Sequence, residues 1–301
     1  MNDNENKIIE MVAKPEEKEA KKGRVLLELP LITWVFFGLA AFALLIMLIY
    51  NVSESFANFY NRYPAALFRG TLAAVSSIFP CSLAEALILY LPVAFVAIVI
   101  YANKKYTDSW RSVARFLLIV LSVASMFFST FALNFGAGYH TSSVDKLLML
   151  DRKDVSAEEL KATAEILVEE INLYTESLYA DGNGSTIMPY GYDKLSQKLL
   201  EAYEKVCDEH DFVSRFPSIV KPVMLSEPWT YTHIAGVYTY FTGEANINTN
   251  FPDYTIPYTA AHEMAHQRGI AREDEANFVA FLVCAASDDP YIRYSGYLNL
   301  Y

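Results

Sequence analysis

Two histidines and a glutamate lie close together in the segment His262-Glu263-Met264-Ala265-His266, which has the pattern HExxH. On a helix, residues four apart lie on the same face, so the two imidazoles converge on one point where a divalent ion fits. Glu263 points to one side of that axis, within reach of a water molecule on the ion but not of the ion itself. Two neutral nitrogen ligands, an open position and a carboxylate that acts as general base are what zinc-dependent hydrolysis needs.

A third protein ligand is needed, and acidic residues follow the motif directly. Gly269 is a natural end for the helix that carries the histidines, and a new helix with an acidic start follows it. Many zinc peptidases carry a glutamate ligand as the first residue of an ExxA(D/N) pattern, which Glu273 fits. We therefore predict Glu273 as the third ligand, and Glu275 takes this role if the helix is rotated. Asn277, one turn later, would then hold one of the histidines in place.

The short gap between the second histidine and the acidic residues separates this chain from one group of zinc sites. Seven residues lead from His266 to Glu273, a spacing that resembles the metzincins, which turn at the same glycine. Arg272, however, occupies the place of their third histidine, and a guanidinium cannot ligate a metal. The pattern therefore predicts a glutamate-ligated zinc site of the gluzincin type.

The stretch HEMAHQRGIAREDEANF, with FTGEANIN upstream and YSGYL downstream, resembles a family of bacterial multi-pass membrane proteins. That family is known only as a domain of unknown function with an HExxH site. The resemblance extends over most of the chain and implies a zincin-like catalytic domain on a helical membrane anchor, with no established substrate. It also implies a protein that continues past the position of Tyr301.

Three long segments in the first half of the chain are almost free of charged residues. They lie at about 29–50, 83–103 and 114–136, and each is close to the roughly 20 apolar residues that cross a bilayer. The hydrophobic fraction of 53% is high for a soluble chain. These segments predict three transmembrane helices within a membrane domain at 29–136. The residues at about 63–80 are too interrupted to span, and we predict an interfacial helix there.

Basic residues set the predicted orientation of these spans. The loop between the second and third spans carries Lys104, Lys105 and Arg111, and the N-terminal tail, residues 1–28, ends in further basic residues. Loops rich in Lys and Arg stay in the cytoplasm. We therefore predict a multi-pass protein of the cell membrane with a cytoplasmic tail and with residues 137–301 outside. The tail is rich in Lys and Glu, which predicts disorder.

Charge is distributed unevenly between the two halves of the chain. Residues 1–136 hold 12 Lys and Arg against 10 Asp and Glu, a net charge of +2, whereas residues 137–301 hold 12 against 25, a net charge of −13. An acidic outer domain argues against nucleic acid as a partner. The expected partners are the lipid bilayer and a peptide or protein substrate outside the cytoplasm.

The outer domain, residues 137–301, combines helical patterns with a β-rich stretch at 234–242. Zincins place a strand beside the cleft, upstream of the HExxH helix, and an extended peptide pairs with its edge. We predict that this stretch is that strand, with Tyr240 and Asn246 as substrate-binding residues, although an ordinary core strand fits the same pattern. The expected fold is an α+β zincin-like domain on three transmembrane helices.

Peptide hydrolysis also needs a group that stabilises the negative charge of the transition state. Tyr, His or Arg near the metal usually supplies it. His233 is one candidate for this role, and Tyr231, Tyr240, Tyr258 and Arg268 fit it by residue type. The sequence does not choose among them.

Together these features predict a membrane-anchored zinc metallopeptidase that acts as an endopeptidase outside the cytoplasm. Glu263 would take a proton from water and pass it to the leaving amine. An alternative keeps the fold without turnover, as a zinc-containing membrane sensor or scaffold that binds peptides. An intramembrane protease would need the motif within an apolar span, and the charged residues Arg268, Arg272 and Glu273 beside the motif argue against it.

Overall fold

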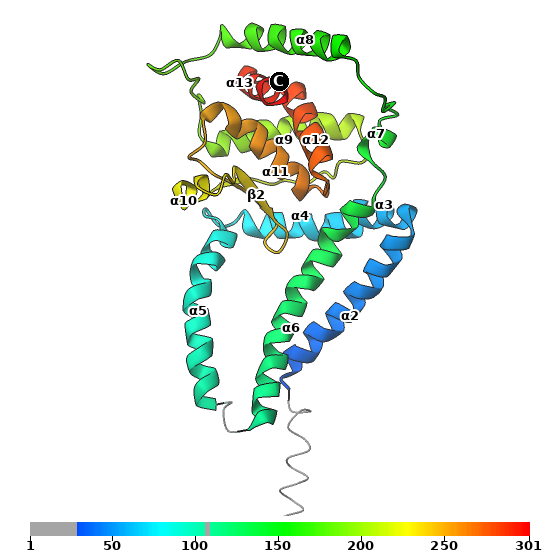
Figure 1. The fold of residues 1–301 in the computed structure, drawn as a ribbon, viewed down its shortest axis with the longest axis vertical. Helices are drawn as coiled ribbons and strands as arrows, with labels where there is room; N and C mark the ends of the chain where they lie inside the picture. Colours follow the sequence, from blue (N-terminus) through cyan, green and yellow to red (C-terminus); the bar gives the residue numbers. More distant parts are fainter. Residues whose placement is uncertain (1–28, 106–108) are drawn as a thin grey trace, which may run out of the picture. The chain divides into compact units, whose positions relative to one another are not determined.

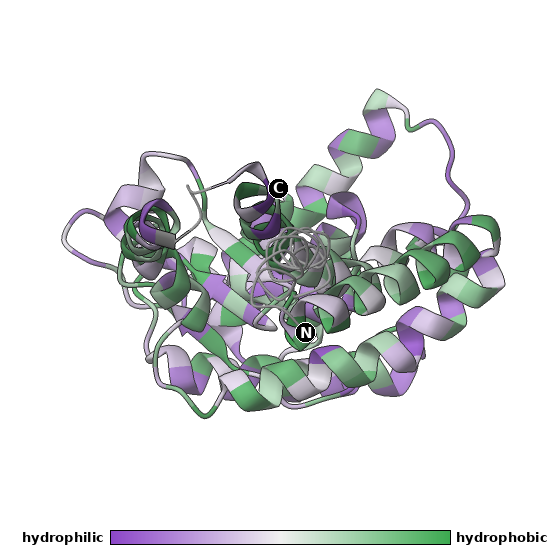
Figure 2. Cartoon of the chain, turned by 90° about the horizontal axis from the view of Figure 1, so that it is seen from below, coloured by the Kyte–Doolittle hydropathy of each residue, from purple (hydrophilic) through white to green (hydrophobic). Residues whose placement is uncertain are grey.

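Three helices of this protein are long and apolar enough to cross a membrane, as the sequence predicts. The computed structural model describes residues 29–105 and 109–301, so the tail predicted to be disordered, residues 1–28, lies outside the described residues. The three helices are α2 (Leu31–Val52), α5 (Leu83–Lys105) and α6 (Trp110–Asn134). At most 22% of the residues in their apolar windows are buried, and Figure 2 shows green apolar residues in helices of the chain seen from below. Helices of this kind suit lipid, because their backbone groups are paired within the helix.

The contacts of the chain divide it into two compact units. The first consists of the described part of residues 1–44 together with 90–129, which is the larger part of the three apolar helices. The second consists of residues 45–89 and 130–301. It contains the C-terminal end of α2, the N-terminal end of α5, the C-terminal end of α6 and all the elements described below.

Two helices lie between the first and second apolar helices, where the sequence analysis placed one. α3 (Glu54–Arg62) begins at Ser53, whose hydroxyl accepts a hydrogen bond from the backbone of Phe56. α4 (Pro64–Ser76) occupies most of the segment for which an interfacial helix was predicted. The two are separate because Pro64 has no N–H with which to continue the hydrogen bonds of α3.

Three short strands form a mixed sheet in the order β1-β3-β2. β1 (Val220–Pro222) runs parallel to β3 (Glu244–Ile247), and β2 (Gly236–Thr239) runs antiparallel to it. The predicted strand at 234–242 is therefore shorter than expected, because the chain turns after Thr239 and enters β3. In the described sheet β3 is central and β2 is an edge strand.

The remaining helices make unit 2 mostly helical (Figure 1). They are the short η1 (Gly136–His140), α7 (Val144–Leu147), α10 (Ser226–Thr230) and η2 (Asp253–Thr255), and the longer α8 (Ala157–Thr175), α9 (Tyr192–Glu209), α11 (Ile256–Gln267), α12 (Glu273–Ala286) and α13 (Pro290–Leu300). α11, which carries the HExxH motif, contacts α9, α12, α13 and the sheet. Its small residues Ala260, Ala261 and Ala265 are fully buried and allow this close packing. The motif therefore lies on the central helix of unit 2.

Candidate metal centre

The structure brings His262, His266 and Glu273 together at one side of α11. The Nε2 atom of His262 lies 3.2 Å from Oε2 of Glu273, and Nε2 of His266 lies 3.4 Å from Oε1 of Glu273. One ligand atom from each residue lies within 4.8 Å of the other two. Zinc bonds of about 2.0–2.2 Å in tetrahedral geometry separate neighbouring ligand atoms by about 3.3–3.4 Å. The two separations run to different oxygens of Glu273, so they show that the three side chains lie close enough to share one ion.

The surroundings of the two imidazoles leave their Nε2 atoms available. Nδ1 of His266 lies 2.7 Å from the carbonyl oxygen of Ile270, so Nδ1 donates and Nε2 keeps its lone pair. Nδ1 of His262 is buried without an aligned hydrogen-bond partner in the described structure, although the Asn277 side chain interacts with this imidazole. Burial and then the neighbouring His266 lower the pKa of His262. The neutral form, which binds metal, is therefore favoured.

A tight turn after α11 carries the chain from His266 to Glu273. Gly269 has a φ of +93°, a left-handed conformation that favours glycine, and a Cβ there would lie 2.4 Å from Nη2 of Arg69. The carbonyl of Gly269 accepts a hydrogen bond of 3.0 Å from the Asn61 side chain, and Arg69 donates to the carbonyl of Arg268 at 3.3 Å. Residues of α3 and α4 thus hold the turn that positions Glu273.

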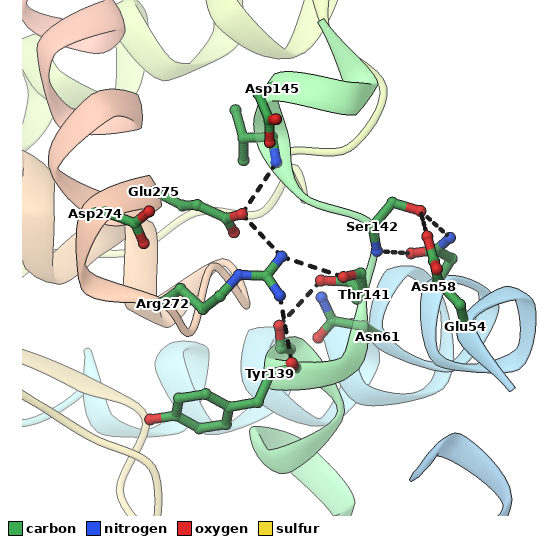
Figure 3. Close-up of polar contacts among 12 residues, drawn as sticks. Glu54, Asn58, Asn61, Tyr139, Thr141, Ser142, Asp145, Arg272, Asp274 and Glu275 are labelled. Carbon is green, nitrogen blue, oxygen red and sulfur yellow. Dashed lines mark hydrogen bonds and ion pairs between the residues drawn. The ribbon is translucent and has the colours of Figure 1, made fainter. Parts of the chain in front are cut away.

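Glu275, the alternative ligand, lies in different surroundings. Figure 3 shows its carboxylate against the Arg272 guanidinium, with which it forms an ion pair of 2.8 Å. It also accepts a hydrogen bond of 3.1 Å from the backbone N–H of Val144. Arg272 also donates to the carbonyl groups of Tyr139 and Thr141. The Glu275 side chain is 5% exposed, whereas that of Glu273 is 76% exposed. The structure therefore places Glu273, and not Glu275, beside the histidines.

The side chain of Glu263, a residue of α11, lies against the edge strand β2. Its carboxylate accepts a hydrogen bond from the backbone N–H of Tyr238. Burial raises the pKa of Glu263 to about 8, and the Tyr238 hydrogen bond opposes this rise. A Cβ at Gly236 would lie 2.7 Å from both Cγ and Oε1 of Glu263, so the strand approaches this side chain closely only because residue 236 is glycine. The carboxylate is thus held in a position where it can exchange a proton.

His262, Glu263, His266 and Glu273 all line one open cavity with a volume of about 510 Å³. One wall is formed by residues 233–238, which include the start of β2, and another by the side chains of α11 and α12. His233 belongs to the first wall, and its φ of +59° is unusual for a residue other than glycine. The cavity therefore combines a candidate ligand set, a carboxylate that is not a ligand and an edge strand.

Two residues predicted to bind substrate do not belong to the described lining of this cavity. Asn246 is fully buried in the central strand, and its amide donates to the Val237 carbonyl and to the Thr239 hydroxyl, each at 3.2 Å. Tyr240 follows the end of β2, and its ring packs against Phe131 with centroids 5.4 Å apart. The strand that lines the cavity ends at Thr239, before Tyr240, and β3, which contains Asn246, is its neighbour in the sheet.

Of the other candidates for stabilising the transition state, some line the cavity and some do not. His233 and Tyr258 line the cavity. Arg268 and Tyr231 lie outside the lining: Arg268 is buried, with its guanidinium 4.0 Å from the centre of the Tyr203 ring, and Tyr231 is exposed. The Tyr258 hydroxyl donates to the Asn277 carbonyl at 3.2 Å, so this tyrosine also supports the residue beside His262.

Three aromatic residues that the sequence analysis did not select also line the cavity. Phe135, the first residue after α6, packs its ring against His266 and Tyr238, with centroids 6.1 Å and 5.3 Å away. Tyr139 follows in η1, and burial raises the pKa values of both Tyr139 and Tyr238. Tyr238 lies in the alternating stretch that predicted a strand. No local pattern marks Phe135 or Tyr139, which long-range packing brings to the site.

The family model described as "Protein of unknown function (DUF3810)" matches residues 60–301 of this chain. Searches of the curated proteins and of the solved structures found no match. The matched segment covers well over half of the chain, and the sequence-based resemblance to a family of unknown function with membrane-like segments agrees with it. The chain therefore belongs to the DUF3810 family.

Proposed function

We propose that this protein is a membrane-anchored zinc metallopeptidase with an α+β zincin-like domain that hydrolyses peptide bonds outside the cytoplasm. The observation that carries the proposal is the placement of Glu263 in the same cavity as His262, His266 and Glu273. A purely structural metal site needs ligands but has no use for a buried carboxylate beside them. A hydrolase needs both.

His262, His266 and Glu273 would hold the zinc ion. Two imidazoles and one carboxylate are a donor set that suits zinc in hydrolytic sites. The Ile270 carbonyl fixes the ring of His266 and directs its Nε2 atom toward the site. A bound zinc ion would supply Lewis acidity, which lowers the pKa of a water molecule and polarises the carbonyl of the scissile bond.

Glu263 would act as the general base and then as the general acid. Its carboxylate takes the proton from the attacking water and delivers it to the leaving amine. The Tyr238 N–H holds this carboxylate, and the absence of a side chain at Gly236 leaves room for it. The close approach of β2 restricts the space that this side chain can occupy.

The edge strand supports a peptide as substrate. Residues 234–238 line the cavity, and β2 pairs with β3 along only one of its edges within the described sheet. An extended peptide can add its backbone hydrogen bonds to a free edge of this kind. His233, at the entrance to this strand, is the proposed stabiliser of the transition state, because the Tyr258 hydroxyl already bonds to Asn277.

The polarity of the apolar helices supports the proposed location. The C-terminal end of α2, the N-terminal end of α5 and the C-terminal end of α6 belong to unit 2. Lys104 and Arg111 lie at the opposite ends of α5 and α6. With these basic residues in the cytoplasm, unit 2 lies outside.

Replacement of the general base tests the catalytic proposal. The Glu263→Gln variant should keep its zinc, since residue 263 is not a ligand, and should hydrolyse peptides about 10²–10⁴ times more slowly. Zinc is measured by mass spectrometry of the purified full chain, and hydrolysis with a peptide library. His262→Ala, which should lose zinc as well as activity, is the comparison.

The same variant separates the peptidase from a zinc-containing sensor or scaffold. A sensor would keep its biological activity in Glu263→Gln and lose it in His262→Ala. Full complementation of a deletion strain by Glu263→Gln would therefore refute the catalytic role of this residue.

A further inference from the structure

The candidate metal centre lies directly beside the end of an apolar helix. Phe135 follows the last residue of α6, and its ring contacts His266 and Tyr238. One turn earlier, the ring of Phe131 packs against Tyr240 with centroids 5.4 Å apart. The last turn of α6 therefore touches both a proposed ligand and the segment that contains the edge strand. A single side chain separates the centre from the helix end.

The length of α6 places that helix end at a predicted boundary of the bilayer. After Arg115, no charged residue occurs before Phe135, a stretch of 20 residues from Phe116 to Phe135. At about 1.5 Å per residue this stretch is about 30 Å long, which matches the hydrocarbon core of a membrane. With Arg115 at the cytoplasmic boundary, Phe135 lies at the outer one.

α4 gives a second, independent indication of where the membrane surface lies. Its buried residues are Ala65, Arg69, Ala73 and Ser76, so the face packed inside unit 2 has small side chains and one charge. Its outer face carries large apolar residues, with Leu67 73% exposed. This pattern is the reverse of an ordinary surface helix, which exposes its charges and buries its apolar residues.

The Arg69 guanidinium explains how α4 buries a charge. It donates to the Asn61 side chain and to the carbonyl groups of Asn61, Asn134 and Arg268. The charge of Arg69 is thus balanced by hydrogen-bond acceptors inside unit 2. Its outer apolar face suits the boundary of a bilayer, where water does not surround it.

α4 also lies close to the cavity. It packs against β3, which pairs with the cavity-lining strand β2. Phe135, which follows α6 at this predicted boundary, lines the cavity, so one side of the cavity lies at the predicted membrane surface. A peptide segment that emerges from the bilayer therefore reaches the cavity more readily than a peptide segment of a soluble protein.

We infer that the substrates of this site are membrane-anchored proteins, cut in the segment just outside the bilayer. This inference rests on the proposed peptidase function. A chain that emerges from the same membrane remains in the layer where the cavity opens, and its effective concentration there far exceeds that of a free peptide. The edge strand β2 then pairs with the extended segment next to the membrane anchor.

Mapping of cleavage sites in cells tests this inference. Protein N-termini are compared by mass spectrometry between cells that express the full chain and cells that express Glu263→Gln. We expect new termini only with the unaltered chain, within about 10 residues of the outer end of a membrane span or lipid anchor. New termini mainly in soluble proteins, or far from any anchor, would overturn the inference and leave the peptidase standing. Identical termini in both cells would contradict the peptidase itself.

Presentation of one cleaved sequence in three forms gives the quantitative test in vesicles that contain the full chain. The sequence is placed next to a transmembrane anchor, on the same anchor behind a spacer of about 20 flexible residues, or in a free peptide. We expect kcat/KM to be highest for the first form and about 10²-fold or more lower for the free peptide. Equal kcat/KM for all three forms would overturn the inference.

A matched pair of surface variants isolates the contribution of α4. Leu67→Asp and Leu160→Asp each place a charge at an exposed leucine of a helix, since these side chains are 73% and 65% exposed. Leu67→Asp should lower cleavage of the anchored form at least about threefold and leave cleavage of the free peptide unchanged. Leu160→Asp, on α8, should change neither. Equal effects of the two variants would show that the outer face of α4 does not contact the bilayer.

Discussion

The turn between α11 and α12, residues 268–272, has two sides with different surroundings. On one side, which we call the anchored side, Asn61 and Arg69 donate to the carbonyl groups of the turn. On the other side, which faces the cavity, His266 and Glu273 lie together with an open volume in front of them. Polar groups of the anchored side are bonded to the chain, whereas those of the cavity side are directed at one another and at solvent.

The two glutamates of the first turn of α12 show what this difference means. Positions 273 and 275 are about 200° apart around a helix, so their side chains point in nearly opposite directions. Glu275 is bonded to Arg272 and to the backbone of Val144, which leaves little capacity for a metal. Glu273 is exposed and lies against two imidazoles. Contacts on the anchored side fix the start of α12, and on the cavity side the Glu273 carboxylate stays available as a ligand.

The largest effect that tests this comparison is on zinc binding. Glu273→Gln should lower zinc affinity at least about 100-fold, because loss of even an outer-shell partner typically costs about 10–100-fold. Glu275→Gln should keep nearly all of the zinc affinity but reduce the free energy of unfolding by about 1–3 kcal/mol, since a buried charged partner is lost. Zinc competition with a chelator and thermal unfolding of the purified chain measure the two quantities.

The opposite pattern would reverse the assignment of the two carboxylates. If Glu275→Gln lost its zinc while Glu273→Gln kept it, the helix would be rotated relative to the described arrangement. The two substitutions have the same size and charge change, so each is the control for the other.

A smaller effect is expected from the strand side of the cavity. Gly236→Ala would place a Cβ 2.7 Å from the Glu263 side chain and 2.9 Å from Cγ2 of Thr259, so the carboxylate has to move. A misplacement of about 1 Å in a catalytic group can cost about 10²-fold in rate. Peptide hydrolysis by Gly236→Ala should fall by about that factor, while its zinc content stays unchanged.

Gly182→Ala is the matched control, because a Cβ at that position has no heavy atom within 4 Å. It should leave hydrolysis unchanged. Full hydrolysis by Gly236→Ala would mean that Glu263 does not depend on the close approach of β2, and the proposed role of this strand in holding it would fail.

The parts of the site that the sequence predicted are those set by local geometry. The i, i+4 spacing of His262 and His266 places both rings on one helix face regardless of the rest of the fold. The position of Glu273 depends on one short turn, and its ExxA(D/N) pattern favoured it over Glu275. The three apolar helices could be predicted because their long charge-free segments, of the length that crosses a bilayer, are visible in the sequence itself.

The parts that could not be predicted depend on contacts between distant segments. Phe135 and Tyr139 reach the cavity because α6 ends beside it, and no local pattern reports that. Asn246 was predicted to bind substrate because it follows an apparent edge strand. The chain instead returns after Thr239, and Asn246 lies in the buried centre of the sheet. Which strand lies at the exposed edge of the sheet depends on how the strands pair.

The smallest expected effect concerns the anchored side itself. Asn61→Ala removes the 3.0 Å hydrogen bond to the Gly269 carbonyl and an acceptor of Arg69, at a residue that is almost fully buried. The free energy of unfolding should fall by about 1–3 kcal/mol. Glu273 follows this turn, so zinc affinity should also fall, by less than the roughly tenfold lower limit for direct outer-shell partners.

Asn58→Ala is the control for this change, because both asparagines lie on α3 and both bond to the chain outside it. Asn58 bonds to Ser142, at 2.9 Å through its amide and at 2.9 Å through its carbonyl oxygen, and does not bond to the described turn at 268–272. It should lower stability without changing zinc affinity. Equal zinc affinity in the two variants would show that the ligand turn keeps its position without the Asn61 contact. The small effect on zinc expected here, against the large one for Glu273→Gln, is what distinguishes a residue that positions a ligand from the ligand itself.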